Sequence, residues 1–184
     1  MPNILDFVTI KSNEKESHQI VTLTDKNPIK VFTDGACHNN GKKYAKAGIG
    51  IYFGKNDKRN VSERIQGKQS NNTAELKAII KTYKILKKEI KSNQIINIYS
   101  DSIYAIRCCN DYGLKMYKNN WKKKNKYIPN HLLVKEAFSL FYKKNNIKLI
   151  HVKAHTNNKD ELSLGNAEAD RLANKAILNK KYHN

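Results

Sequence analysis

Apolar and polar positions along the chain follow two periods, and the change from one to the other outlines its elements. Residues 29–33, 47–53 and 61–66 are short runs rich in β-branched and aromatic side chains, and their close spacing predicts three antiparallel strands. The first run ends at Asp34-Gly35, a dipeptide typical of turns. Apolar residues then recur at helical spacing over residues 73–91, which predicts an amphipathic helix.

The rest of the chain alternates between strand and helix. Two more strands are predicted at residues 95–99 and 148–152, and three more helices at 102–110, 131–144 and 166–179. Strands joined by crossover helices lie parallel, so the first, fourth and fifth strands should be parallel neighbours, with the second and third antiparallel. We expect an α/β fold: a mixed five-stranded sheet with helices on both faces.

The chain has the length of one domain. Its 184 residues fall in the usual range of about 100–200 per domain. Residues 1–29 show no sustained periodicity, and we interpret them as an N-terminal extension with at most partial order. Residues 30–184 are predicted to form the folded domain.

Basic residues greatly outnumber acidic ones. Lys and Arg total 35 against 16 Asp and Glu, a formal net charge of +19. Such a surface repels itself unless something anionic shares it. Nucleic acid is the leading candidate and an anionic membrane the second, while a compositional bias toward lysine is the alternative that needs no partner. The lysines do not form one long amphipathic helix, which disfavours the membrane.

The chain carries no sign of export. It has no run of about 18 apolar residues, and its first residues lack the pattern of a secretory signal. The cysteines, Cys37, Cys108 and Cys109, have neither the even number of a disulfide framework nor the spacing of a zinc site. We therefore expect an intracellular protein, in the cytoplasm or nucleus.

Four carboxylates belong to elements that should meet at one edge of the sheet. Asp34 ends the first strand and Asp101 follows the fourth, where ligands of open α/β sheets bind. On adjacent strands the two would lie roughly 5 Å apart. Glu75 falls in the first turn of the helix before the fourth strand, and Asp170 near the start of the last helix. Carboxylates this close repel one another unless a cation lies between them, and Mg²⁺ suits such ligands best.

Each of these residues also has an ordinary structural explanation. Asp34-Gly35 would serve as a hairpin turn, and Glu75 would complete a capping box with Asn72. Asp101 would cap the helix that follows it, and Asp170 would be a charge on a solvated helix face.

Six short motifs connect these residues to a known family. They are residues 32–36 (FTDGA), 47–50 (AGIG), 72–76 (NTAEL), 100–102 (SDS), 151–155 (HVKAH) and 165–170 (GNAEAD). In order and rough spacing, over residues 30–178, the chain resembles type 1 ribonuclease H. The resemblance implies a ribonuclease H-like fold and an endoribonuclease that cleaves the RNA strand of RNA–DNA hybrids. Two Mg²⁺ ions, with Mn²⁺ as a substitute, would act there, and the products would carry 5′-phosphate and 3′-hydroxyl ends.

The resemblance assigns roles to single residues. Asp34, Glu75, Asp101 and Asp170 match the four metal-binding carboxylates of the family, and Asp34 would bridge the ions. His155 matches a mobile histidine that assists proton transfer or product release. The alternative for His155 is an ordinary polar residue in a loop.

The resemblance also points to contacts with the hybrid. Five residues would meet the minor groove, where the 2′-hydroxyl distinguishes RNA from DNA: Cys37, Asn39, Asn40, Asn71 and Asn72. Turn and N-cap chemistry is the alternative for these asparagines. Lys68 and Ser70, with Asn130 as a third member, match a pocket for a phosphate of the DNA strand. Many relatives have Arg at the Lys68 position, and Lys offers a point charge in place of a bidentate fork.

Residues 115–126 resemble the basic protrusion of the family, which lies along the DNA strand. Lys122, Lys123 and Lys124 would bind phosphate there and Trp121 would pack on a sugar. A solvated lysine-rich loop is the alternative. The segment between His155 and Asp170 looks like a long loop, which would move the histidine or bring Asp160 and Glu161 near the metals.

Two other functions remain open at this point. One is another nuclease of the same fold, such as a junction resolvase or an integrase core, and the other is a hybrid-binding module without catalysis. Residues 1–29 look too short for the hybrid-binding module that some relatives carry, so we do not expect processivity from such a module. We expect a monomer with no obligatory protein partner.

Overall fold

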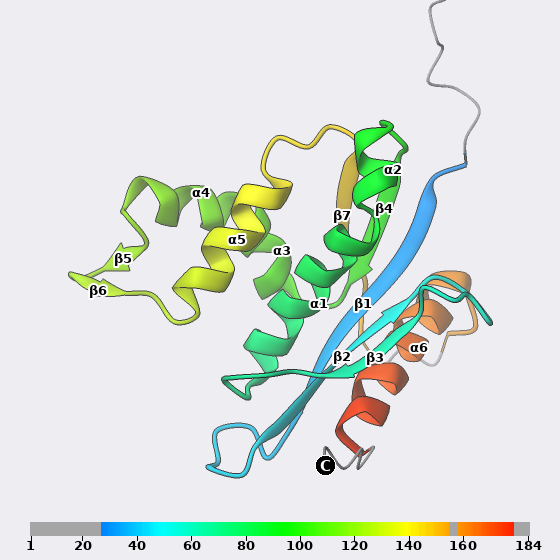
Figure 1. The fold of residues 1–184 in the computed structure, drawn as a ribbon, viewed down its shortest axis with the longest axis horizontal. Helices are drawn as coiled ribbons and strands as arrows, with labels where there is room; N and C mark the ends of the chain where they lie inside the picture. The colour runs from blue at the N-terminus through cyan, green and yellow to red at the C-terminus, as the bar shows by residue number, and fades with distance from the viewer. Residues whose placement is uncertain (1–26, 155–157, 179–184) are drawn as a thin grey trace, which may run out of the picture.

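The computed structural model of the protein describes residues 27–154 and 158–178 (Figure 1). Its centre is a five-stranded sheet in the order β3-β2-β1-β4-β7, in which β1, β4 and β7 run parallel and β2 and β3 antiparallel. The strands are β1 (Ile29–His38), β2 (Lys46–Tyr52), β3 (Val61–Arg64), β4 (Ile96–Ser100) and β7 (Ile147–His151). The mixed sheet predicted from the sequence is confirmed.

Helices cover both faces of this sheet, as expected. One face packs against the last helix, α6, which contacts β1, β2 and β3, and the other against α1, with α3 and α5 beside it. Figure 1 shows α6 on the opposite side of the sheet from α1. The helices are α1 (Asn71–Ile85), α2 (Lys87–Lys91), α3 (Ile103–Cys109), α4 (Asp111–Lys118), α5 (His131–Phe141) and α6 (Glu161–Leu178). No helix within residues 27–154 and 158–178 is both long and apolar enough to cross a membrane.

Successive side chains of β1 point to opposite faces of the sheet and belong to two separate cores. Val31 belongs to the larger apolar cluster that includes Leu76 of α1, whereas Phe32 packs with Tyr99 and Ala169 on the α6 side. This arrangement holds the end of β1 between two helices. Side chains from both helices can therefore reach the same point beyond that strand.

The Asp34-Gly35 turn predicted from the sequence is wrong. β1 runs through both residues to His38, because β2 stays paired with it as far as the His38–Lys46 pair. Gly35 is needed for packing instead of turning. A Cβ atom built on it would lie 2.2 Å from the backbone nitrogen of Glu75, so only glycine lets α1 approach β1 this closely.

Three predicted helices have clearly different bounds in the structure, and the one predicted over residues 131–144 ends at Phe141. The helix predicted over residues 73–91 is divided at Leu86, whose side chain is fully buried and whose backbone (φ −89°, ψ 16°) leaves helical geometry. The last helix begins at Glu161, because Asp160 accepts hydrogen bonds from the backbone N–H groups of Leu162 and Ser163. Asp170 therefore lies in the middle of α6.

The long loop expected before Asp170 is consequently wrong, since most of that segment is helix. Glu161 forms an ion pair with Lys30, at the beginning of β1 and away from Asp34, and Asp160 caps α6. Neither carboxylate joins the other acidic residues.

The structure also contains elements that the sequence pattern did not reveal. They are helix α4 and a small hairpin, β5 (Lys122–Lys123) with β6 (Lys126–Tyr127), and together they project from one side of the sheet domain (Figure 1). The extension predicted at residues 1–29 lies almost entirely outside the described residues, so that division of the chain stays a prediction.

Candidate active site

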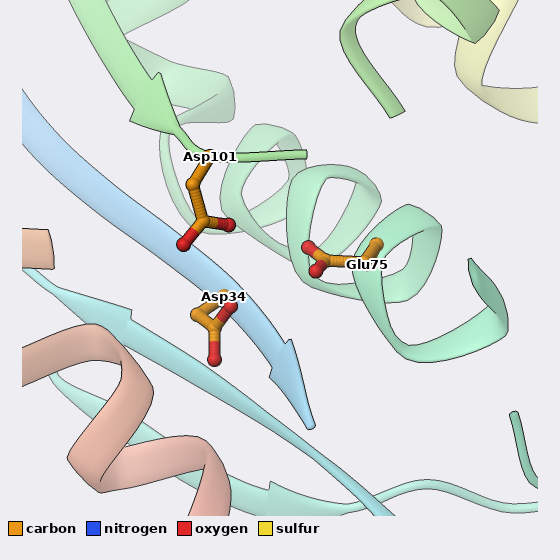
Figure 2. Close-up of side chains that lie close together, drawn as sticks. All are labelled: Asp34, Glu75 and Asp101. Atoms are coloured by element: carbon orange, nitrogen blue, oxygen red, sulfur yellow. The ribbon is translucent and has the colours of Figure 1, made fainter. Parts of the chain in front are cut away.

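Three carboxylates converge beyond the carboxyl end of β4. The last parallel pair between β1 and β4 joins Thr33 and Ser100, so Asp34 and Asp101 are the next residue of each segment. Glu75 reaches the same point from α1. One oxygen from each of the three carboxylates lies within 4.8 Å of the other two (Figure 2).

The position of Glu75 follows from how α1 begins. Ser70 is the N-cap, and its hydroxyl accepts a hydrogen bond from the backbone N–H of Thr73. The capping box considered for Glu75 and Asn72 is therefore wrong. Glu75 instead lies one turn into the helix, faces the sheet and is only 5% exposed.

Asp101 is likewise free of the capping role considered for it. Ser102 caps α3 by accepting a hydrogen bond from the backbone N–H of Ala105. The Asp101 carboxylate instead accepts a hydrogen bond of 3.0 Å from the side-chain amide of Asn166, on α6. Asn166 is 4% exposed, and its amide oxygen has no hydrogen-bond partner within the described chain. Sequence reasoning gave Asn166 no role, although it belongs to the quoted GNAEAD motif.

Asp170 lines the same cavity as these three carboxylates, a space of about 520 Å³. It is held by Asn174, one turn further along α6, which donates a hydrogen bond of 2.8 Å to its carboxylate. The amide oxygen of Asn174 lies 2.9 Å from the Nε2 atom of His38, at the end of β1. Both residues line the cavity and were missed from the sequence. The four-residue spacing of Asp170 and Asn174 on one helix was the available signal.

The electrostatics of the cluster favour a cation. Burial raises the pKa of Asp34 to about 7, and the nearby Asp101 and Asp170 carboxylates add to this effect. Burial and the charges of Asp34 and Asp101 likewise raise the pKa of Glu75 well above its usual range, while the Gly35 N–H works in the opposite direction. One oxygen of Glu75 is buried without a hydrogen-bond partner in the described residues. A buried acidic oxygen without a donor, close to two further carboxylates, fits a hard divalent cation, so this triad could bind a metal ion.

Two of the five residues predicted to meet the minor groove line the cavity, and the other three are not among its lining residues. Cys37 and Asn71 line it. The side-chain oxygen of Asn40 accepts a hydrogen bond of 3.4 Å from the backbone N–H of Asn71, which joins the loop after β1 to the start of α1. Asn39 adopts a left-handed conformation (φ 55°) in that loop, and Asn72 is exposed in the first turn of α1. Turn and helix-start geometry therefore accounts for part of this asparagine pattern.

Two members of the predicted phosphate pocket meet at Thr73. The hydroxyl of Thr73 lies 2.7 Å from the Ser70 hydroxyl and donates a hydrogen bond of 3.3 Å to the side-chain oxygen of Asn130. Asn130 itself begins α5 in a left-handed conformation (φ 57°). Lys68 is exposed, and within the described chain its side chain forms no hydrogen bond with Ser70 or Asn130. Thr73 is only 2% exposed and connects Ser70 to Asn130, and its role was not predicted from the sequence.

The predicted basic protrusion is built from α4 and the β5–β6 hairpin. Lys122, Lys123 and Lys124 are exposed on it. Trp121 is half-buried, with its ring centroid 6.0 Å from those of both Tyr117 and Phe138. The indole thus anchors the hairpin on α4 and α5, and the sugar contact expected of Trp121 stays a prediction.

His155 lies outside the described residues. Ala154, the last described residue before it, lines the cavity. The role of His155 stays a prediction.

The sheet order and the buried acidic triad define an α/β protein with a potential metal site. A family model described as RNase H matches residues 26–178, and the chain belongs to this family. Membership agrees with the resemblance drawn from the motifs and argues against a junction resolvase or an integrase core.

Curated relatives agree. The chain is 32% identical over 148 residues to Ribonuclease H1 of Homo sapiens, which covers 79% of this chain and 48% of that protein. It is 39% identical over 145 residues to Ribonuclease H of Schizosaccharomyces pombe (78% of this chain, 50% of that protein). It is 31% identical over 148 residues to Ribonuclease H of Clostridium botulinum strain Hall (80% of this chain, 93% of that protein). The chain thus spans about half the length of the human and yeast relatives.

Solved structures support the fold. The solution structure of the PFV RNase H domain matches with a TM-score of 0.60 at 22% identity, covering 80% of this chain and 93% of that one. A foamy viral protease-reverse transcriptase in complex with an RNA/DNA hybrid matches with a TM-score of 0.65 at 20% identity, covering 96% of this chain and 22% of that one.

Proposed function

We propose that this chain is a ribonuclease H, an endonuclease that hydrolyses the RNA strand of RNA–DNA hybrids and leaves 5′-phosphate and 3′-hydroxyl ends. The observation that carries the proposal is the meeting of Asp34, Glu75 and Asp101 at one point of an RNase H fold. The three carboxylates come from separate elements, and burying acidic oxygens together costs free energy, which supports a functional site here.

Two Mg²⁺ ions, with Mn²⁺ as a substitute, are the proposed cofactors. When bound, such ions supply an activated water and stabilise charge on the leaving oxygen. Asp34, the most central carboxylate, would contact both ions, with Glu75, Asp101 and Asp170 around it. The hydrogen bonds from Asn166 to Asp101 and from Asn174 to Asp170 would hold two of these ligands in orientation.

The remaining proposed roles concern the substrate. Five residues at the end of β1, on the loop after it and on the first turn of α1 would meet the 2′-hydroxyls of the RNA strand: Cys37, Asn39, Asn40, Asn71 and Asn72. Lys68, Ser70 and Asn130 would hold a phosphate of the DNA strand, and Trp121 with the lysines at residues 122–124 would follow that strand further. His155 would carry a proton to or from the reacting groups.

The protein is further proposed to act as a monomer within the cell. Three free cysteines, of which Cys108 and Cys109 are buried, support a reducing compartment.

A substrate panel tests the proposal. The protein is incubated with end-labelled RNA–DNA hybrid, duplex RNA and duplex DNA, each with Mg²⁺, Mn²⁺ or a chelator. We expect cleavage only in the hybrid, only in its RNA strand and at internal positions. Cleavage should require a divalent ion. Tight binding of the hybrid without cleavage under any metal would contradict the proposal and favour a non-catalytic hybrid-binding module.

A further inference from the structure

We propose that a second cavity, at the α2 end of the sheet, is a docking site for an acidic segment of a partner protein that inserts one large apolar side chain. The cavity measures about 650 Å³, within the usual range of roughly 300–1,000 Å³ for ligand sites. It lies where β4 and β7 begin, whereas the acidic triad lies beyond the other end of β4. In Figure 1 this region is where α2 stands beside the starting ends of β4 and β7.

The inner wall of this cavity is apolar. Tyr83 of α1, Ile90 of α2 and Ile95 before β4 line it. Ile90 is 7% exposed and belongs to the main core, and Tyr83 packs edge-on against Phe141 at a centroid distance of 5.2 Å. The wall is therefore part of the rigid core and would favour an apolar side chain over water.

The rim carries four lysines from two separate segments. Lys87 and Lys91 project from α2, one turn apart, while Lys143 and Lys144 belong to the connection between α5 and β7. All four are exposed, and none takes part in an ion pair within residues 27–154 and 158–178. No acidic side chain of the described residues lines the cavity. The positive charge of the rim is thus uncompensated, and carboxylates are its natural complement.

The two walls are already fixed to each other. The side-chain amide of Asn146, before β7, donates hydrogen bonds of 3.0 and 3.1 Å to the backbone oxygens of Ile90 and Gln94. The backbone N–H of Ile96 also donates to the Asn146 carbonyl at 2.9 Å. A site whose walls are held in this way spends little free energy on ordering when a ligand binds.

An acidic peptide fits these features better than the other occupants. A nucleic acid would use the lysines but has no apolar side chain for the wall formed by Tyr83, Ile90 and Ile95. A second copy of this chain carries the same charge of +19 and would be repelled. An acidic segment with an apolar anchor satisfies both the rim and the wall.

Fluorescence polarisation with three probes tests this inference. The first probe is a fluorescein-labelled peptide with one central phenylalanine and two glutamates on each side, and the second has serine in place of the phenylalanine. The third is a labelled thymidine oligonucleotide of the same net charge. We expect the phenylalanine peptide to bind roughly tenfold more tightly than the serine peptide, and both more weakly as salt rises.

Charge-reversal variants locate the binding. Lys87→Glu combined with Lys91→Glu should weaken the binding of the phenylalanine peptide by roughly tenfold, and Lys144→Glu alone should weaken this binding less. Lys55→Glu combined with Lys58→Glu changes the net charge equally, on exposed positions of the β2–β3 connection, and is the matched control. It should change the affinity by less than about twofold.

Three results would overturn the inference: equal binding of the two peptides, an oligonucleotide affinity that equals or exceeds that of the phenylalanine peptide and falls when Lys87 and Lys91 are reversed, or an equal loss of peptide affinity in the control variant. Cleavage of labelled hybrid is measured on the same proteins and should stay at the wild-type rate. A failure of peptide binding is thereby distinguished from a failure of the proposed nuclease function.

Discussion

Replacing Gly35 with alanine should move α1 away from β1 and lower the rate of cleavage. This effect on the active site can be measured apart from the loss of fold stability. The added Cβ would lie 2.2 Å from the Glu75 nitrogen, 2.5 Å from the Ala74 carbonyl carbon and 2.8 Å from the Glu75 Cα. All three are backbone atoms, so the clash cannot be relieved by a side-chain rotation. To restore an ordinary contact, α1 must move away from β1 by roughly 1 Å.

That movement has two expected consequences. Overpacking of this kind costs about 1–3 kcal/mol of unfolding free energy, and the upper part of this range applies because backbone must shift. The displacement also withdraws the Glu75 carboxylate from Asp34 and Asp101. Since a misplacement of about 1 Å at a reacting centre can lower a rate by roughly a hundredfold, kcat on hybrid should fall by about that factor.

The assay combines urea unfolding, Mg²⁺ titration and single-turnover cleavage of labelled hybrid. Gly113→Ala is the matched control, because its Cβ on α4 would lie 2.1 Å from the backbone oxygen of Cys108 in α3, and neither residue lines the carboxylate cavity. It should lose comparable stability yet keep kcat at saturating hybrid. If Gly35→Ala binds Mg²⁺ and cleaves like the wild type, Glu75 is not placed by this contact and the reasoning fails.

Three further outcomes are expected. The raised pKa of Asp34, about 7 against an ordinary 3.8, means that its contribution to stability without metal is fully present below pH 3.8 and is lost as pH rises through about 7. In urea unfolding, Asp34→Asn should therefore gain stability relative to the wild type over this window with chelator present, and a pH-independent difference would refute the shift. Asn174→Ala removes the hydrogen bond to Asp170 and should raise the Mg²⁺ concentration for half-maximal cleavage by roughly tenfold, with an unchanged midpoint as the contrary result. Neutralising the lysines at residues 122–124 should flatten the log–log salt dependence of hybrid binding by up to about one unit per lost phosphate contact, whereas an unchanged slope would identify a solvated loop.

The parts of the fold that the sequence could predict are those written in local periodicity. The five main strands were found because they are short apolar runs rich in β-branched and aromatic residues, and most helices because their apolar residues repeat about every 3.6 positions. The proximity of Asp34, Glu75 and Asp101 could be predicted because the crossover connection through α1 makes β1 and β4 parallel neighbours. The order of the six motifs then indicated one family among the many that share an α/β fold.

The parts that escaped depend on contacts between distant segments. Asp34-Gly35 looks like a turn in isolation, and only the approach of α1 explains why a glycine stands inside β1. The hydrogen bond of Asn166 to Asp101, and that of His38 to Asn174, each join residues more than sixty positions apart. Such contacts have no local signature. The start of α6 is different, because Asp160 is a recognisable N-cap whose signal was available and was not used.

The most direct test of the carboxylate cluster is cleavage of labelled hybrid by Asp34→Asn and Asp101→Asn, with hybrid affinity measured on the same samples. Asp111→Asn is the control, since that exposed carboxylate pairs with Arg107 at 3.1 Å outside the cavity. The account predicts that both active-site variants lose cleavage to background with Mg²⁺ while they bind hybrid nearly as tightly as the wild type, and that the control keeps both properties. Near-wild-type cleavage by either active-site variant would contradict it.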